Sequence, residues 1–151
     1  MFRSIDHVGL TVRNLMKSIA FYRDVLGGKV AYTRLTQDGW DVEGVSRAVG
    51  VPGAVLKSAR VLIGDNTLEL IEYDPPGLPY SASNGDVGIR HVSFEVGDIR
   101  EAYDSLQGQG VRFNTPPFEI TQDGPQKGFK FCYFFDPDGI QLEIFQRPPR
   151  S

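Results

Sequence analysis

The chain has 151 residues, 40% hydrophobic and 23% charged, with a formal net charge of −3 and a pI near 5.3. This composition excludes a largely disordered chain, and the length suffices for one domain or for two half-size units that share a core. The acidic balance argues against nucleic acid or an anionic membrane as the main partner, because both attract a basic surface.

Three features of the sequence bear on membrane association, secretion and the state of the cysteine. No apolar stretch approaches the ~20 residues that a membrane span needs, so no membrane partner is expected. The first expected strand begins by Ile5, which leaves no room for a signal peptide and favours a cytoplasmic location. The single cysteine, Cys132, stands in an apolar run and is expected to be a buried, inert thiol.

The first half begins with residues 7–12, where apolar and polar side chains alternate as in a strand with one buried face. A helix is predicted to follow, with Asn14 as its N-cap and Gly27 and Gly28 at its end. The remaining elements predicted for this half are strands over residues 29–35, 56–64 and 66–73, and a short helix within 41–51.

The second half repeats this order. A strand over residues 91–96 precedes a helix that Asp98 caps, with Glu101 completing a capping-box pattern and Gly108 and Gly110 at the end. Strands are then expected over 111–113, 129–135 and 140–146. The predicted class is therefore α+β, with one module over 1–73, a linker rich in Pro, Gly and Ser over 74–86, a second module over 87–147, and a tail over 148–151.

The only two histidines, His7 and His91, open the two copies of this pattern. Each is matched by a glutamate in a second repeated phrase, Glu69 in LELI and Glu143 in LEIF. A lone glutamate in an alternating strand usually faces solvent, and a lone histidine is usually structural. Repetition changes this interpretation, because two His and two Glu at equivalent places of a duplicated unit are hard to obtain by accident.

Alternation places all four side chains on the strand faces turned away from the helices. If those faces line a pocket, two carboxylates brought together would repel each other unless a cation compensates them. Two imidazoles and two carboxylates form a mixed N/O set that suits Zn, Ni, Co, Mn or Fe and leaves positions open for substrate.

Five phrases resemble the vicinal oxygen chelate superfamily, the group of glyoxalase I, methylmalonyl-CoA epimerase, extradiol dioxygenases and the bleomycin- and fosfomycin-resistance proteins. They are IDHVGLTV, SIAFYRDVLG, LELIEY, GIRHVSFEV and FDPDGIQLE, and they span most of the chain. The resemblance implies two tandem βαβββ modules that form an incomplete barrel around a metal site. It implies His7, Glu69, His91 and Glu143 as ligands of a divalent metal ion, and it suggests a homodimer.

The resemblance also frames the function, with glyoxalase I or methylmalonyl-CoA epimerase as the most similar members. The expected activity is that of a metal-dependent lyase or isomerase acting on a small-molecule substrate with vicinal oxygens through an enediolate. A ligand glutamate that loosens from the metal is the candidate base, and the resemblance favours Glu143 over Glu69. A metal-free protein that binds an antibiotic is one alternative. An Fe(II) extradiol-type dioxygenase is the other, weakened by the lack of a third histidine.

Several further side chains are weaker candidates for contacts with a substrate. Glu43 and the cations Arg60, Lys127 and Lys130 are candidates for the site, with a solvated surface as the alternative. The aromatic residues that are candidates for lining a pocket, with the core as the alternative, are Trp40, Phe113, Phe129, Phe131 and Tyr133.

Overall fold

The computed structural model describes residues 3–35, 41–80, 85, 88 and 91–149. Trp40 lies outside the described residues. The chain divides into two compact units, Met1–Pro79 and Tyr80–Ser151, and each contains a four-stranded sheet and helical structure. The boundary falls inside the segment 74–86 that the sequence predicts as a linker.

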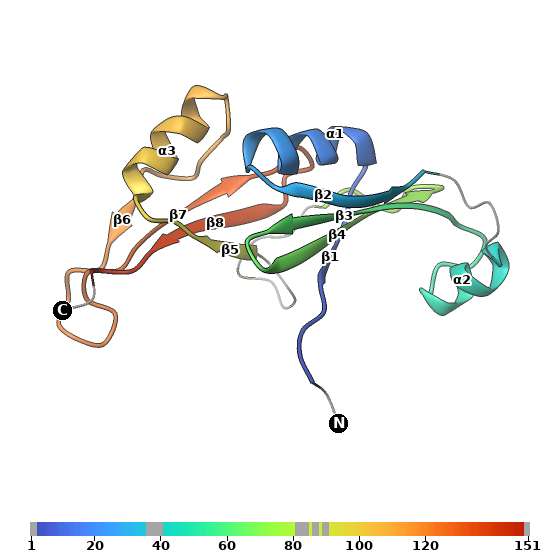
Figure 1. Ribbon diagram of the computed structural model, residues 1–151, viewed down its shortest axis with the longest axis horizontal. Coiled ribbons are helices and arrows are strands. Elements are labelled where there is room, and N and C mark those ends of the chain that lie inside the picture. Colours follow the sequence, from blue (N-terminus) through green and yellow to red (C-terminus); the bar gives the residue numbers. More distant parts are fainter. Residues whose placement is uncertain (1–2, 36–40, 81–84, 86–87, 89–90, 150–151) are drawn as a thin grey trace. The chain divides into compact units, whose positions relative to one another are not determined.

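The first unit, module 1, is a four-stranded sheet with helices (Figure 1). Its strands lie in the order β1-β4-β3-β2, with β1 parallel to β4 and the other neighbours antiparallel. In chain order its elements are β1 (Val8–Thr11), α1 (Leu15–Ala20), η1 (Phe21–Val25), β2 (Lys29–Arg34), α2 (Val42–Ala48), β3 (Val55–Ile63) and β4 (Asn66–Asp74).

Local chemistry sets the ends of the first helical segment. The side chain of Asn14 accepts a hydrogen bond from the Lys17 N–H, as the sequence predicts for an N-cap. After α1 the helix widens into one π-helical turn, η1, which the sequence did not predict. Gly27 then adopts a φ of +73°, which favours glycine and ends the helix.

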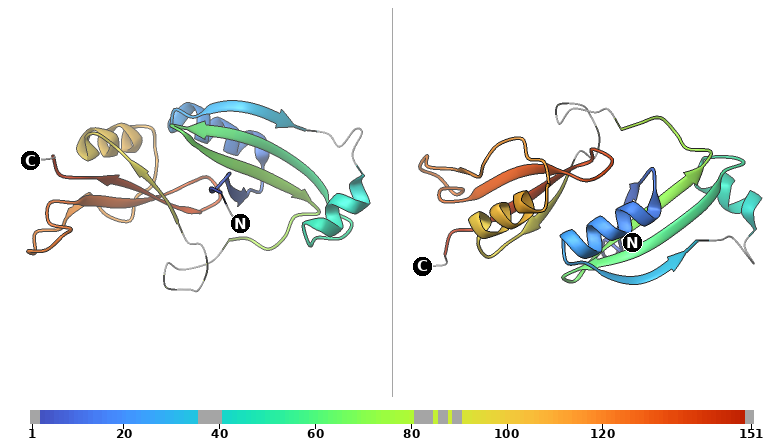
Figure 2. Two further views of the ribbon diagram at one scale, coloured as in Figure 1. Left: turned by 60° about the horizontal axis from the view of Figure 1, so that its bottom comes forward. Right: turned by 90° about the horizontal axis from the view of Figure 1, so that it is seen from above.

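The core of module 1 lies between α1 and one face of the sheet. The helix packs on β3 and β4, and Figure 2 shows it lying across that face. The buried apolar side chains that fill this layer include Leu15, Ile19, Tyr22, Ala59, Val61, Leu68 and Leu70. Since Leu68 and Leu70 point to the helix, the alternation of a strand turns Glu69 to the opposite face of the sheet.

The second unit, module 2, repeats the arrangement. Its sheet has the order β5-β8-β7-β6, with β5 parallel to β8 and the other neighbours antiparallel. Its elements are β5 (His91–Glu95), α3 (Ile99–Gly108), β6 (Phe118–Glu119), β7 (Lys130–Phe135) and β8 (Gln141–Gln146). The α+β class and the repeated βαβββ order predicted from the sequence are confirmed. Both sheets are open rather than closed barrels.

One predicted strand is wrong. Residues 111–113 contribute only an isolated bridge between Phe113 and Phe134, and the strand that pairs with β7 is the two-residue β6. The reason lies in Pro116 and Pro117, which have no backbone N–H to donate to a ladder. They interrupt the edge of the sheet between the bridge and β6.

Both modules share a helix cap that comes from a strand. In module 1 the Leu15 N–H, at the start of α1, donates to the Glu72 carboxylate of β4 over 2.7 Å. In module 2 the Ile99 N–H, at the start of α3, donates to the Gln146 Oε1 of β8 over 2.9 Å. Each strand thus satisfies a backbone donor that a helix start leaves without a partner.

No helix in the described part of the chain is long and apolar enough to cross a membrane.

Candidate metal-binding site

In module 1 the sheet brings His7 and Glu69 together. His7 directly precedes β1, and β1 pairs in parallel with β4 so that Gly9 lies opposite Glu69. The His7 Nε2 lies 3.1 Å from the Glu69 Oε2. The side chains are 34% and 19% exposed, so Glu69 is largely shielded from water rather than on a solvated face.

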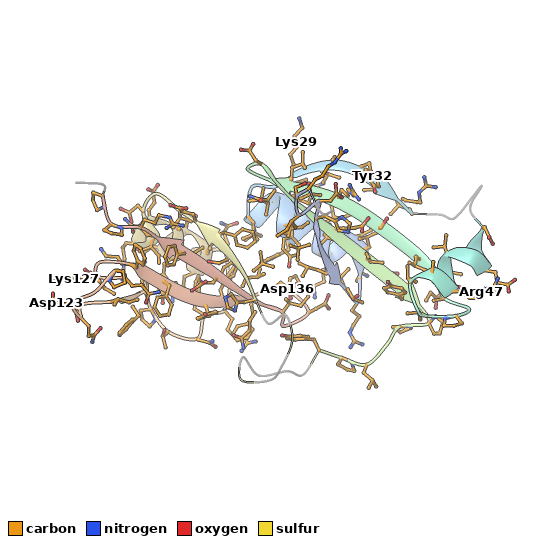
Figure 3. The ribbon with its side chains drawn as sticks, turned by 90° about the horizontal axis from the view of Figure 1, so that it is seen from below. Lys29, Tyr32, Arg47, Asp123, Lys127 and Asp136 are labelled. Atoms are coloured by element: carbon orange, nitrogen blue, oxygen red, sulfur yellow. The ribbon has the colours of Figure 1, made fainter. Side chains whose placement is uncertain are left out.

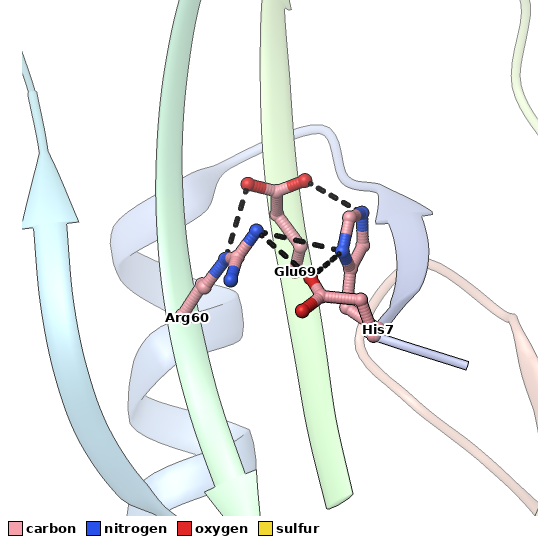
Figure 4. A network of polar contacts seen from close by, with 4 residues as sticks. His7, Arg60 and Glu69 are labelled. Carbon is pink, nitrogen blue, oxygen red and sulfur yellow. Dashed lines mark hydrogen bonds and ion pairs between the residues drawn. The ribbon is translucent and has the colours of Figure 1, made fainter. Parts of the chain in front are cut away.

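Two more charged residues complete this cluster (Figure 4). The Asp6 Oδ2 lies 2.8 Å from the His7 Nδ1, and the Arg60 Nη2 lies 3.3 Å from the same Asp6 oxygen. The Arg60 Nε lies 3.7 Å from the Glu69 Oε1. The hydrogen bond to His7, followed by the charge of Arg60, lowers the pKa of Asp6. Asp6 and Glu69 thus flank one guanidinium and one imidazole.

In module 2 the same register brings His91 and Glu143 together. Ser93 of β5 lies opposite Glu143 of β8, and His91 lies two residues before Ser93 on the same face. The His91 Nε2 lies 3.6 Å from the Glu143 Oε2. The Glu143 side chain is only 11% exposed, so it is one of the few buried carboxylates among the described residues.

The residue that faces the glutamate across the neighbouring strand differs between the modules. In module 1, Arg60 of β3 pairs in register with Glu69. In module 2, Tyr133 of β7 pairs in register with Glu143 and lies edge-on to the His91 ring at 5.1 Å. Burial raises the pKa of Tyr133, and the charge of Glu143 and a hydrogen bond to it add to this effect.

The weaker cationic and acidic candidates divide between the site and the surface. Arg60 lies beside His7 and forms ion pairs with Asp6 and Glu69, so its charge is balanced by carboxylates of the chain itself. Glu43 pairs with Arg47 on the exposed surface of α2. Lys127 pairs with Asp123 in the β6–β7 loop, and Figure 3 shows both there, with Arg47 on α2. Lys130 lies 3.6 Å from Glu119.

The aromatic candidates divide as well. Phe113 packs on Tyr103 of α3, on the helix side of module 2. Phe131 shares the strand face of Tyr133, and their ring centroids are 6.1 Å apart. Phe118 of β6 lies edge-on to Phe131 at 5.7 Å, and Phe129 lies in the same way against Phe145 at 5.3 Å. Aromatic surface therefore adjoins the Glu143 cluster.

Cys132 has the opposite orientation to Tyr133 and is buried, as the sequence predicts. Burial, with the nearby charge of Glu143 as a second cause, raises the pKa of its thiol to about 12. A thiol in this state is a poor nucleophile at neutral pH, because the thiolate is the reactive form.

Each module thus supplies one imidazole and one carboxylate whose donor atoms lie side by side, the donor types that first-row divalent metals accept. No group of three or more His, Cys, Asp or Glu side chains placed to hold a metal occurs within the residues that the structure describes. The Glu143 carboxylate fits a bound cation, because it is buried and has no Lys or Arg ion pair among the described residues of its own module.

Residues 4–144 match the Glyoxalase/Bleomycin resistance protein/Dioxygenase superfamily. The two open sheets, each built from a βαβββ unit, agree with that match. The chain belongs to this superfamily.

Comparison with single proteins adds detail. The chain is 36% identical to a 2-epi-5-epi-valiolone epimerase of Actinomyces sp, over 96% of this chain and 80% of that one. It is 26% identical to the human mitochondrial methylmalonyl-CoA epimerase, over 94% of this chain and 73% of the relative. The fold is similar to a fosfomycin resistance protein, FosX, from Listeria monocytogenes, solved with Mn(II) and sulfate. That match has a TM-score of 0.65 and 16% identity, and it covers 98% of this chain and 95% of the other.

Proposed function

We propose that the chain is a divalent-metal-dependent isomerase of the epimerase type, which acts on a small substrate with two neighbouring oxygens. The observation that carries the proposal is the His–Glu pair that each module places on the sheet face away from its helix. The similarity to two epimerases supports isomerisation over the lyase reaction that the sequence left open.

The proposed ligands are His7, Glu69, His91 and Glu143, two from each module. Zn, Ni, Co, Mn and Fe all suit this donor set, and the Mn(II) in the FosX structure supports a metal of this class. We propose a homodimer on the strength of the family resemblance, and the four ligands can come from one chain or from two. When bound, the ion supplies a Lewis acid for the two substrate oxygens, which eases removal of the adjacent proton.

Within this proposal the two glutamates have different tasks. Glu69 is already engaged by Arg60, whereas Glu143 has no Lys or Arg partner among the described residues of module 2. Glu143 is therefore the proposed proton acceptor. Its carboxylate oxygen takes the proton as the C–H bond breaks, and the electron pair stays with the substrate. A proton from solvent then adds to the opposite face of that carbon, and Glu143 releases its own proton to solvent, which completes the epimerisation.

The direct test is exchange of substrate hydrogen with solvent. We expect the wild-type protein, loaded with Mn(II) or Co(II) in D2O, to incorporate deuterium into 2-epi-5-epi-valiolone or, failing that, methylmalonyl-CoA, as followed by NMR. Glu143→Gln should lower the exchange rate by roughly 100-fold or more, because the amide cannot accept the proton. Glu119→Gln, which changes an exposed glutamate of the same module, is the matched control and should keep the wild-type rate.

Full exchange by Glu143→Gln with metal still bound would refute the assignment of the base. No exchange by the wild-type protein, with tight binding of an aromatic antibiotic that survives a chelator, would favour the second candidate, a metal-free binding protein. The aromatic pairs next to Glu143, Phe118 with Phe131 and Phe131 with Tyr133, are the observation that supports this second candidate.

A further inference from the structure

We infer that Arg60 is a positioning residue that competes with the metal for the Glu69 carboxylate, so that Glu69 is the less tightly held of the two glutamate ligands. The inference rests on the proposed function, because it concerns the ligands named there. It assigns unequal roles to two glutamates that the duplicated sequence presents as equivalent.

Several contacts hold the Arg60 side chain in position. Its guanidinium lies between the carboxylates of Asp6 and Glu69, at 3.3 and 3.7 Å, and over the ring of Tyr32 at 5.9 Å from the centroid. The Arg60 Nε is hidden from solvent and has no hydrogen-bond partner. The Glu69 Oε1 lies 3.7 Å from this nitrogen, so a small movement of either side chain would complete a hydrogen bond between them.

No Lys or Arg among the described residues of module 2 forms an ion pair with Glu143. The residue in the corresponding register position is Tyr133, whose neutral ring and hydroxyl face the carboxylate. Among the described residues of module 2, the only ion-pair partner of Glu143 is His91, at 3.6 Å. Among the described residues, the Glu69 carboxylate therefore has an arginine beside it, whereas the Glu143 carboxylate has the neutral hydroxyl of Tyr133.

The consequence follows from the electrostatics of a partly buried pair. Opposite charges less than 4 Å apart attract more strongly there than in bulk water, because less solvent screens them. To bind a metal, Glu69 must give up part of its attraction to Arg60, and this cost lowers the affinity for the metal. Glu143 has no Lys or Arg ion pair among the described residues of module 2, so we expect Glu69 to contribute less to the metal affinity than Glu143 does.

The test is a double-mutant cycle read by metal affinity rather than by activity. The dissociation constant for Mn(II) is measured by chelator competition for the wild type, Arg60→Met, Glu69→Gln and the double variant. We expect Arg60→Met to tighten binding by about tenfold when Glu69 is present, and by less than about threefold in the Glu69→Gln background. Glu69→Gln alone should weaken binding less than Glu143→Gln.

Two controls separate this effect from the loss of a positive charge in general. Arg47→Met removes an exposed arginine from α2 of the same module and should leave the affinity unchanged. Arg60→Gln keeps a polar side chain of similar length, so it provides the same test if Arg60→Met does not fold. Equal tightening with and without Glu69 would overturn the role of Arg60 and leave the proposed function standing. No Mn(II) binding by the wild type would overturn both.

Discussion

His7 has two ring nitrogens with different surroundings, and this difference bears on its proposed role as a ligand. The Nδ1 lies 2.8 Å from the Asp6 carboxylate, and the Nε2 lies 3.1 Å from Glu69. When Nδ1 carries the proton, the Nδ1–H donates a hydrogen bond to Asp6 and the lone pair is at Nε2, the atom beside the other proposed ligand. A carboxylate that fixes the tautomer in this way commonly supports a metal-binding histidine.

Asp6 is therefore expected to matter for metal binding although it is not a ligand. Asp6→Ala should weaken Mn(II) binding by roughly tenfold, because the imidazole loses the acceptor that holds its tautomer. Chelator competition measures this change. Asp65→Ala, which removes an exposed aspartate from the β3–β4 turn, serves as the control for lost negative charge. Equal losses in both variants would mean that Asp6 acts only through its charge.

The four proposed ligands were predicted from the sequence because each copy of the repeated pattern contains one His and one Glu at equivalent positions. The partners of those ligands were not. Arg60 and Tyr133 occupy the same register position in the two modules, but a repeat reveals what two halves share, and these residues differ. Arg60 was a candidate for an anionic part of the substrate, whereas in the structure it meets two carboxylates of its own chain.

At the scale of the elements, both modules fix the start of their helix with a strand side chain three residues after the proposed ligand glutamate. Glu72 follows Glu69 in β4, and Gln146 follows Glu143 in β8. The same strand thus presents one side chain at the helix start and one on the opposite sheet face. These two caps could not be predicted from the sequence, because Glu and Gln are common on exposed strands and no local pattern marks Glu72 or Gln146 as a helix cap.

The two caps should respond differently to acid. The hydrogen bond from Leu15, followed by the effect of Lys57 against the cost of burial, lowers the pKa of Glu72 from its usual 4.5. A lowered folded-state pKa means that the cap stabilises the fold above that usual value and loses this contribution as the pH falls through the folded pKa. Gln146 does not titrate, so its cap should be independent of pH.

Urea unfolding at pH 7 and at pH 3 checks this expectation. Glu72→Ala should lower the free energy of unfolding by about 1 kcal/mol at pH 7 and by clearly less at pH 3. Gln146→Ala, the matched variant of module 2, should have a similar cost at both pH values. A cost for Glu72→Ala that does not shrink in acid would mean that the charge of Glu72 contributes nothing to the cap.

The order of elements was predictable, and their irregularities were not. Alternation, an N-cap such as Asn14 and a glycine such as Gly27 mark the strands and helices in the sequence, and the structure confirms them. The π-helical turn η1 contains the fully buried Tyr22, and no local sequence pattern predicts it. The edge strand β6 was misplaced because the pattern of residues 111–113 resembles a strand, whereas the prolines that follow decide where pairing resumes.

At the scale of the whole molecule, duplication explains the division of tasks. Each module has its own buried core, including Leu70 in one and Leu142 in the other, and each turns one His–Glu pair to the sheet face opposite its helix. The two modules share the His–Glu pair but differ in the residues around it. In module 1 the pair lies beside the cation Arg60, and in module 2 it lies beside the aromatic rings of Tyr133 and Phe131. The chemistry proposed here needs both pairs.

The most direct test of this claim is the metal content of the purified protein, determined by elemental analysis after reconstitution with Mn(II), Co(II) or Zn(II). The wild type should hold about one divalent ion per chain, and both His7→Ala and His91→Ala should lose most of it, because each module contributes one imidazole. Absence of metal from the reconstituted wild type, or full retention in either variant, would contradict a site built from both pairs.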